Sequence, residues 1–258
     1  MSTVTSHTPG TVCWIDLMTT DAAAAREFYG ALFGWVFDES GPEFGHYSVG
    51  HKDGHRAIGL GPIPPGQEMP AAWSVYFWTD DIDATATAIT EAGGTLIMPP
   101  MDVGEPGHMT VAQDPTGAVF GVWQPKEHRG FQIINEPGAF AWSECNTPDA
   151  DAAAAFYGKV FDVTHQRLEG GMPTTYYTLH KGEAVVAGVL QMNEHWAGVP
   201  PHWMVYLAVS DIDVSVEQVK TLGGKVAVMP FPTPYGRISV VTDPQGATFT
   251  LIQLTQPG

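Results

Sequence analysis

The amino-acid sequence predicts an α+β protein made of two homologous halves, each containing two β-α-β-β-β modules. Three observations lead to this prediction. The chain has 258 residues, enough for two domains of ordinary size. Hydrophobic residues make up 44% of it, which allows a sizeable core. The two halves also repeat one another, and this repeat decides the domain count.

Three collinear blocks carry the repeat. Residues 9–30 align with residues 137–158, with 11 of 22 positions identical. Residues 73–94 align with residues 203–224, and residues 114–120 align with residues 243–249. Because the offset between the halves drifts by only two residues, the differences are small loop insertions. We expect a tail at 1–8, a first domain at 9–126, a linker at 127–136 and a second domain at 137–256.

The first module of each half opens with a strand, which is residues 11–17 in the first half. Asp21 is well placed to cap the alanine-rich helix that follows and ends near Phe33 and Gly34. Residues 46–61 read as two strands joined by a turn at Lys52-Asp53-Gly54.

The second module opens with a strand at residues 73–79. Asp81 or Asp83 caps the next helix, which Gly93-Gly94 ends. Strands follow at 95–98, 109–113 and 118–124, the last two joined by an Asp-Pro-Thr-Gly turn. The second half repeats this order, so β-α-β-β-β occurs four times.

The excess of acidic residues makes some classes of binding partner unfavourable. Asp and Glu number 28 against 11 Lys and Arg, a formal net charge of −17 at pH 7. Such a surface repels nucleic acid and anionic lipid, so we expect neither as a partner. Two cysteines provide no disulfide framework, and no signal peptide or membrane-spanning run is visible. We expect a cytoplasmic monomer or homodimer whose partner is a small molecule.

The motifs together resemble a known family. They are Trp-x-Asp/Glu followed by Thr-x-Asp and Phe-Tyr, then Asp-Ile-Asp with a later Gly-Gly, and finally Asp-Pro-x-Gly. This combination resembles the vicinal oxygen chelate superfamily, which contains glyoxalase I, bleomycin-resistance proteins and extradiol dioxygenases. It is most similar to two-domain actinobacterial members labelled glyoxalase-like or hydroxylase. The resemblance covers nearly the whole chain and implies two cupped eight-stranded mixed sheets, with helices outside and a ligand inside each cup.

The resemblance also implies metal ligands on certain inner strands. Those positions hold Trp14, Gly59, Ser74 and Gly121 in the first half, and Trp142, Gly188, Met204 and Thr250 in the second. None of these is a usual ligand for a divalent metal. We therefore expect no metal centre and no cofactor.

Strand alternation then defines the candidate site, because residues two apart share one face. The expected inner faces hold a carboxylate among aromatic side chains: Trp14, Asp16, Tyr76 and Trp78 in the first half, and Trp142, Glu144, His202, Met204 and Tyr206 in the second. The aromatic residues and Met204 would contact the ligand, or simply pack in the core.

Burial could raise the pKa of Asp16 or Glu144 and make either one a catalytic acid or base. Glu144 is the stronger candidate, because His202 on the same face could share the proton. Alternatively, both carboxylates accept structural hydrogen bonds. His108 and Arg237, at equivalent positions after a glycine, could guard the cup mouth or meet an anionic group.

Two function classes remain open. The protein could act without metal on a small apolar or carbonyl-bearing metabolite. It could instead bind or sequester a compound such as an antibiotic or a pathway intermediate, without turnover. A metal-dependent lyase or dioxygenase is a third alternative.

Overall fold

The computed structural model describes residues 4–169 and 174–255, and within them each half follows the expected order of elements. The first half contains β1 (Val12–Thr19), α1 (Ala22–Phe33), β2 (Val36–Glu39), β3 (Ser48–Lys52), β4 (His55–Pro62), β5 (Ala72–Trp78), α2 (Ile82–Glu91), β6 (Thr95–Asp102), β7 (Gly107–Gln113) and β8 (Val119–Pro125). The second half contains β9 (Phe140–Thr147), α3 (Ala150–Phe161), β10 (Thr164–Arg167), β11 (Tyr176–Lys181), β12 (Ala184–Gln191), β13 (His202–Ala208), α4 (Ile212–Thr221), β14 (Lys225–Thr233), β15 (Gly236–Thr242) and β16 (Thr248–Leu254).

Each half forms one mixed eight-stranded sheet. The strand order is β2-β3-β4-β1-β5-β8-β7-β6 in the first half, and the second half repeats it with β10-β11-β12-β9-β13-β16-β15-β14. The central strand β1 runs parallel to β4 and antiparallel to β5. The fold class expected from the repeat is therefore confirmed.

Capping aspartates start the four helices. The Asp21 carboxylate accepts a hydrogen bond from the Ala24 amide, and Asp81, Asp149 and Asp211 cap the other helices in the same way. After α1, Gly34 has a φ of 71°, a left-handed conformation that glycine adopts without strain.

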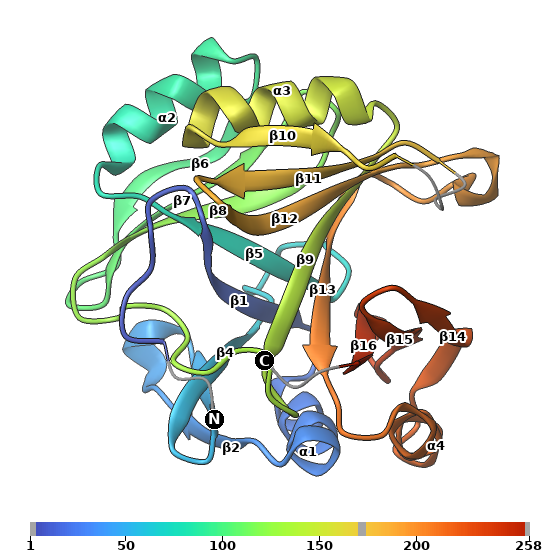
Figure 1. Ribbon diagram of the computed structural model, residues 1–258. Coiled ribbons are helices and arrows are strands. Elements are labelled where there is room, and N and C mark those ends of the chain that lie inside the picture. The colour runs from blue at the N-terminus through green and yellow to red at the C-terminus, as the bar shows by residue number, and fades with distance from the viewer. Residues whose placement is uncertain (1–3, 170–173, 256–258) are drawn as a thin grey trace.

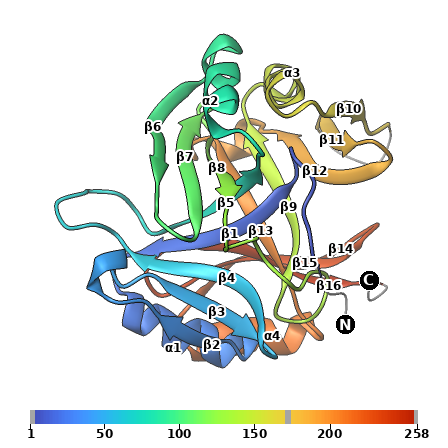
Figure 2. The ribbon, with the colours of Figure 1, turned by 90° about the vertical axis from the view of Figure 1, so that its left-hand side faces the viewer.

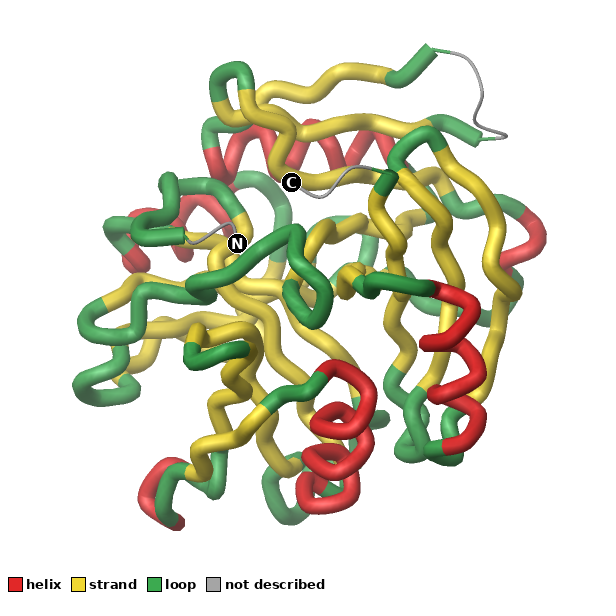
Figure 3. Tube along the Cα trace, turned by 60° about the horizontal axis from the view of Figure 1, so that its bottom comes forward, coloured by secondary structure: helices red, strands yellow, loops and turns green. Residues whose placement is uncertain are grey.

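The two halves pack through the outer faces of their sheets. Helix α1 lies beside α4, and α2 lies beside α3 (Figure 1). The helices cover the outer faces of the strands (Figure 3). Aromatic rings from both halves fill the space between the sheets, and the Phe77 ring lies 5.3 Å from that of Trp203. Both halves thus share one hydrophobic core.

A reciprocal pair of hydrogen bonds crosses this interface. The Tyr29 hydroxyl on α1 donates to Asp243 Oδ2 at 2.9 Å, and the Tyr157 hydroxyl on α3 donates to Asp114 Oδ2 at 2.9 Å. The sequence predicted turns at the Asp-Pro-x-Gly motifs, without any role between the two halves. Asp114 does accept turn amides, from Thr116 to Ala118, but it also ties the two halves together.

The inner face of each sheet carries the carboxylates and aromatic residues expected at the candidate site. We call the inner face of the first sheet the first cup and that of the second sheet the second cup. Both sheets curl, and the curvature is visible from two sides (Figures 1 and 2).

Candidate functional site in the two cups

A buried carboxylate lies on the inner face of each central strand. On β1 the outward residues Cys13, Ile15 and Leu17 enter the shared core, and Asp16 points into the first cup with 4% of its surface exposed. Glu144 holds the same position on β9 and is 7% exposed. The expected alternation of faces thus places both carboxylates inside the cups.

In the first cup, hydroxyl groups rather than backbone amides hold the carboxylate. Asp16 Oδ2 accepts hydrogen bonds from the hydroxyls of Tyr76 at 3.1 Å and Tyr47 at 3.3 Å. The Trp14 indole donates in turn to the Tyr47 hydroxyl at 2.9 Å. The other oxygen, Asp16 Oδ1, is buried without a hydrogen-bond partner, so it is free to meet a ligand or a proton.

The second cup repeats this arrangement. The Tyr206 hydroxyl donates to Glu144 Oε1 at 3.2 Å, and the Trp142 indole donates to the Tyr176 hydroxyl at 3.3 Å. The Tyr176 hydroxyl also lies close enough to Glu144 to favour its ionised form. Each cup therefore contains the same four-residue cluster of Trp, carboxylate and two Tyr.

Burial sets the proton affinity of both carboxylates. It raises the pKa of Asp16 to about 7 and the pKa of Glu144 to about 7, because the charged form loses its hydration. The tyrosine hydrogen bonds oppose this rise without cancelling it. Burial and the nearby carboxyl groups raise the pKa of the tyrosines well above its ordinary value, so these remain neutral donors. Near neutral pH, each carboxyl can both accept and donate a proton.

Tyr47 and Tyr176 are the members of this cluster that were not expected. Neither is on the inner face of a central strand: Tyr47 precedes β3, and Tyr176 begins β11. A repeat signal was available, because residues 47–52 align with 176–181 and share a tyrosine, a histidine and a lysine. The hydroxyls of these two tyrosines also lie next to Gly59 and Gly188, which are two of the expected metal-ligand positions.

The residues present do not fit the metal centre that the resemblance implies. A Cβ built on Gly59 would overlap the Tyr47 hydroxyl, and one on Gly188 would overlap the Tyr176 hydroxyl. The Tyr76 ring fills the space beside Gly121 in the same way. Tyrosines thus occupy the volume that ligand side chains would need. Among the described residues, no group of three or more His, Cys, Asp or Glu side chains could hold a metal ion.

The two cups differ in what covers them. In the first cup, the His128 ring lies 4.4 Å from the Trp14 ring and 5.6 Å from that of Trp123. The His7 ring lies 5.6 Å from that of Trp78, whose indole donates to Asp80. The N-terminal segment and the segment expected as a linker therefore lie across the first cup.

The second cup is lined by smaller side chains. Where the first sheet pairs Trp78 with Trp123, the second pairs Ala208 with Ile252. A separate apolar cluster forms on this face; it consists of Met204, Tyr206, Ala208 and Ile252, with Ala141, Trp142, Ile238, Val240 and Leu254 partly buried against it. At this level of the sheet, the second cup therefore has an alanine and an isoleucine where the first has two tryptophans.

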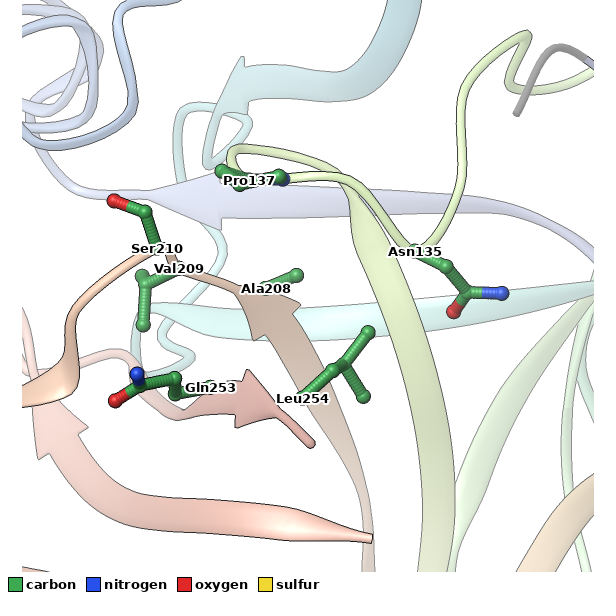
Figure 4. A pocket seen from close by; sticks show the side chains of 7 residues that line it. All are labelled: Asn135, Pro137, Ala208, Val209, Ser210, Gln253 and Leu254. Atoms are coloured by element: carbon green, nitrogen blue, oxygen red, sulfur yellow. The ribbon is translucent and has the colours of Figure 1, made fainter. Parts of the chain in front are cut away.

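A surface depression lies at one end of the second cup, where β13 ends (Figure 4). Asn135, Pro137, Ala208, Val209, Ser210, Gln253 and Leu254 line it. It does not include Glu144. We place the candidate site at the buried carboxylate instead, because that is where a reactive group and apolar walls meet.

The remaining expected site residues lie apart from the carboxylates. His202 is on the inner face, but its Nδ1 bonds the Pro200 carbonyl at 2.8 Å and its Nε2 lies 3.2 Å from the Asn146 amide nitrogen, so it makes no hydrogen bond to Glu144. Burial lowers the pKa of His202.

Arg237 forms a two-point ion pair with Asp213 at the start of α4, at 2.6 and 3.0 Å. His108 lies 3.6 Å from Asp102 in a surface hollow beside the start of α2. The structure thus places neither residue with the carboxylate clusters.

Comparison with known proteins agrees with the fold. The family model described as "Glyoxalase/Bleomycin resistance protein/Dioxygenase superfamily" matches residues 11–122 and 128–251. "Putative glyoxylase CFP32" of Mycobacterium tuberculosis is 39% identical over 249 residues, covering 95% of each chain. "Anthracycline biosynthesis protein DnrV" of Streptomyces peucetius is 37% identical over 267 residues, covering 98% of this chain and 96% of its own.

Solved structures share the fold at lower sequence identity. The Mn(II)-bound glyoxalase from Novosphingobium aromaticivorans superposes with a TM-score of 0.66 at 14% identity, covering 97% of this chain and 86% of its own. The 2,2',3-trihydroxybiphenyl 1,2-dioxygenase from Sphingomonas wittichii RW1 superposes with a TM-score of 0.65 at 13% identity, covering 95% and 91%. No helix among the described residues is long and apolar enough to cross a membrane. The chain belongs to the glyoxalase/bleomycin resistance protein/dioxygenase superfamily.

Proposed function

We propose that the second cup binds a neutral, largely apolar small molecule with a carbonyl or hydroxyl group, and that Glu144 exchanges a proton with it. One observation carries this proposal. Glu144 is buried among apolar walls, is held by tyrosine hydroxyls, and has a pKa raised to about 7. A carboxyl group in such surroundings is suited to general acid–base chemistry at neutral pH.

The lining of the second cup favours a neutral ligand. The walls around Glu144 are aliphatic and aromatic, and the inner-face positions of β9, β13, β15 and β16 carry no lysine or arginine. An anionic group would find no cation there and would face the Glu144 carboxyl. The relative named as an anthracycline biosynthesis protein supports this ligand class, since anthracyclines are polycyclic compounds with carbonyl and hydroxyl groups.

In this proposal, Glu144 is the only residue that transfers a proton. Its ionised form takes a proton from a carbon next to the ligand carbonyl, or from a ligand hydroxyl, and its protonated form returns it. Tyr206 and Tyr176 hold the carboxyl in position and remain neutral throughout. No metal takes part in this scheme, in keeping with the tyrosines at the expected ligand positions.

Binding without turnover is the second candidate. His202 bonds Pro200 and Asn146, so the groups that contact Glu144 are two tyrosines whose raised pKa keeps them neutral. A reaction that needs one group to remove a proton and a second group to deliver it to another atom would lack the second group in this cup. The same cup would then serve to sequester the ligand.

Deuterium exchange into 2-tetralone, a neutral bicyclic ketone, separates these candidates. We expect the protein to accelerate the exchange of hydrogen for deuterium at the carbons beside the carbonyl in D2O, and NMR would measure the rate of this exchange. Glu144→Gln should slow the exchange at least tenfold, about 1.4 kcal/mol. Asp16→Asn is the matched control and should leave the exchange unchanged.

Each other outcome has a definite meaning. Saturable binding of 2-tetralone without exchange would favour the sequestering role. Loss of exchange in Asp16→Asn alone would move the working site to the first cup. Neither binding nor exchange would refute the proposal.

A further inference from the structure

Two nitrogen atoms in the first cup are buried without hydrogen-bond partners. They are Nε of Arg56, near the start of β4, and Nε2 of His128, in the segment that crosses the cup. Burying a polar nitrogen without a partner costs free energy. The second cup has no equivalent pair, because the position that corresponds to Arg56 holds Val185.

A β-bulge turns Arg56 toward the inner face. In β4, Ile58 pairs with Gly50 but Arg56 pairs with His51, so one residue of β4 is left over between the two pairs. This extra residue shifts the alternation and puts Arg56 on the same face as Gly59. The second sheet has the same irregularity, next to Val185. The geometry of the position is thus shared, and only the first cup has a cation there.

The covering segment is fixed against this part of the sheet. The Gln132 amide donates to the Arg56 carbonyl at 2.7 Å, and the Arg56 amide donates to Gln132 Oε1 at 3.0 Å. The Phe131 amide donates to the Cys13 carbonyl at 2.9 Å. These bonds hold His128 beside Trp14 and near enough to Arg56 that the guanidinium charge lowers the pKa of His128.

Arg56 also has no ion pair among the described residues. This is notable in a chain with 28 acidic and only 11 basic residues. By contrast, Arg26 pairs with Glu39 and Arg237 with Asp213. Asp16 does not serve as the missing partner, because its Oδ1 has no hydrogen-bond partner and its Oδ2 accepts only from the hydroxyls of Tyr47 and Tyr76.

We infer that the mouth of the first cup binds a small carboxylate between the Arg56 guanidinium and the His128 imidazole. The planar fork of arginine matches a carboxylate, and a neutral imidazole that carries its hydrogen on Nε2 adds a second donor. The Trp14 and Trp123 rings beside His128 suit an apolar body attached to that carboxylate. This site is separate from the second cup, and its ligand differs in charge from the one proposed there.

The other charged groups nearby do not compete for the ligand. The His7 ring lies against Trp78 and Phe131, and its Nε2 is 3.1 Å from the Phe131 carbonyl. His51 lies 3.5 Å from Asp38 at the cup edge. In this part of the first cup, Nε of Arg56 and Nε2 of His128 therefore remain without a hydrogen-bond partner.

An NMR titration with 15N-histidine-labelled protein tests this inference, with benzoate as the probe and benzyl alcohol as its neutral counterpart, at constant ionic strength. We expect benzoate to shift the His128 signals saturably and to raise the pKa of His128. Arg56→Gln should weaken this binding by about tenfold or more, as expected for loss of a charged hydrogen bond. Val185→Gln, at the equivalent position of the second cup, should leave it unchanged.

Three results would overturn the inference. They are no saturable His128 shift with benzoate, equal affinity for benzyl alcohol, and unchanged benzoate affinity in Arg56→Gln. If Arg56→Gln does not fold, His128→Gln replaces it, with thermal stabilisation by benzoate as the readout. Unchanged stabilisation in that variant would equally refute the site. None of these results bears on proton exchange at Glu144.

Discussion

Replacing Glu144 by glutamine should make the protein more stable at high pH. The side chain keeps its size and its ability to accept the Tyr206 hydrogen bond, but it can no longer ionise. Because burial raises the pKa of Glu144 from 4.5 to about 7, the folded protein binds this proton more tightly than the unfolded chain does. Stability therefore falls as pH rises from 4.5 to 7, and stays level above 7.

The size of this effect follows from the two pKa values. A difference of one in pKa corresponds to about 1.4 kcal/mol, so the full cost of ionising Glu144 is about 3 kcal/mol. Between pH 5 and pH 8, the wild-type protein should lose about 2–3 kcal/mol of unfolding free energy relative to Glu144→Gln. Asp16→Asn should show a change of similar size, since the pKa of Asp16 is also raised to about 7.

Urea denaturation at pH 5, 6, 7 and 8 measures this difference. Glu194→Gln is the control, because it removes one negative charge from an exposed position. The stability gap between Glu144→Gln and the wild type should widen steadily up to pH 7. A gap that stays constant across this range would show that Glu144 ionises as freely in the folded protein as in the unfolded one, and would refute the reasoning.

Three further predictions concern other parts of the fold. Tyr157→Phe should lower the unfolding free energy by about 1–3 kcal/mol, because it removes the buried hydroxyl that donates to Asp114 and accepts from the Trp203 indole; a loss below about 0.5 kcal/mol in urea denaturation would contradict this. Gly59→Ala should cost about 1–3 kcal/mol, because the added methyl group displaces the Tyr47 hydroxyl; a melting temperature equal to wild type would contradict it. His128→Gln should improve stability at pH 5 relative to pH 7.5 by about 2 kcal/mol, because burial lowers the pKa of His128 from 6.5 to about 3 and the folded wild type resists protonation there; parallel pH profiles of the two proteins would count against it.

The repeat predicted most of the fold because it compares the chain with itself. Matching residues such as Trp14 and Trp142 fix equivalent strands without any appeal to propensity. The sequence pattern did not predict the strand Val36–Glu39. It is short and largely exposed, so it has neither the length nor the apolar alternation that marks a strand.

The carboxylates could be located from strand alternation, but their partners could not. Asp16 and Glu144 lie on central strands, where the side-chain direction follows from parity. Tyr47 and Tyr176 reach the same carboxylates from another part of the sheet, and only the three-dimensional pairing of β3 and β4 with β1 brings Tyr47 there. The hydrogen bond from Tyr29 to Asp243 also joins residues 214 positions apart.

The segment that crosses the first cup could not be placed from the sequence. His128 falls in a segment that the sequence marks only as a linker, without periodicity. Its position over Trp14 depends on backbone bonds from Phe131 and Gln132 to two separate strands. The residue pattern within the segment itself does not indicate that it lies across the sheet.

Intermolecular NOEs from bound 2-tetralone to labelled methyl groups would test most directly whether the second cup is the ligand site. Met204 and Ile252 report on the second cup, and Met109 reports on the inner face of the first sheet. We expect NOEs to Met204 and Ile252, and their loss when the ligand is displaced. NOEs to Met109 without any to Met204 or Ile252 would contradict the proposal and place the ligand in the first cup.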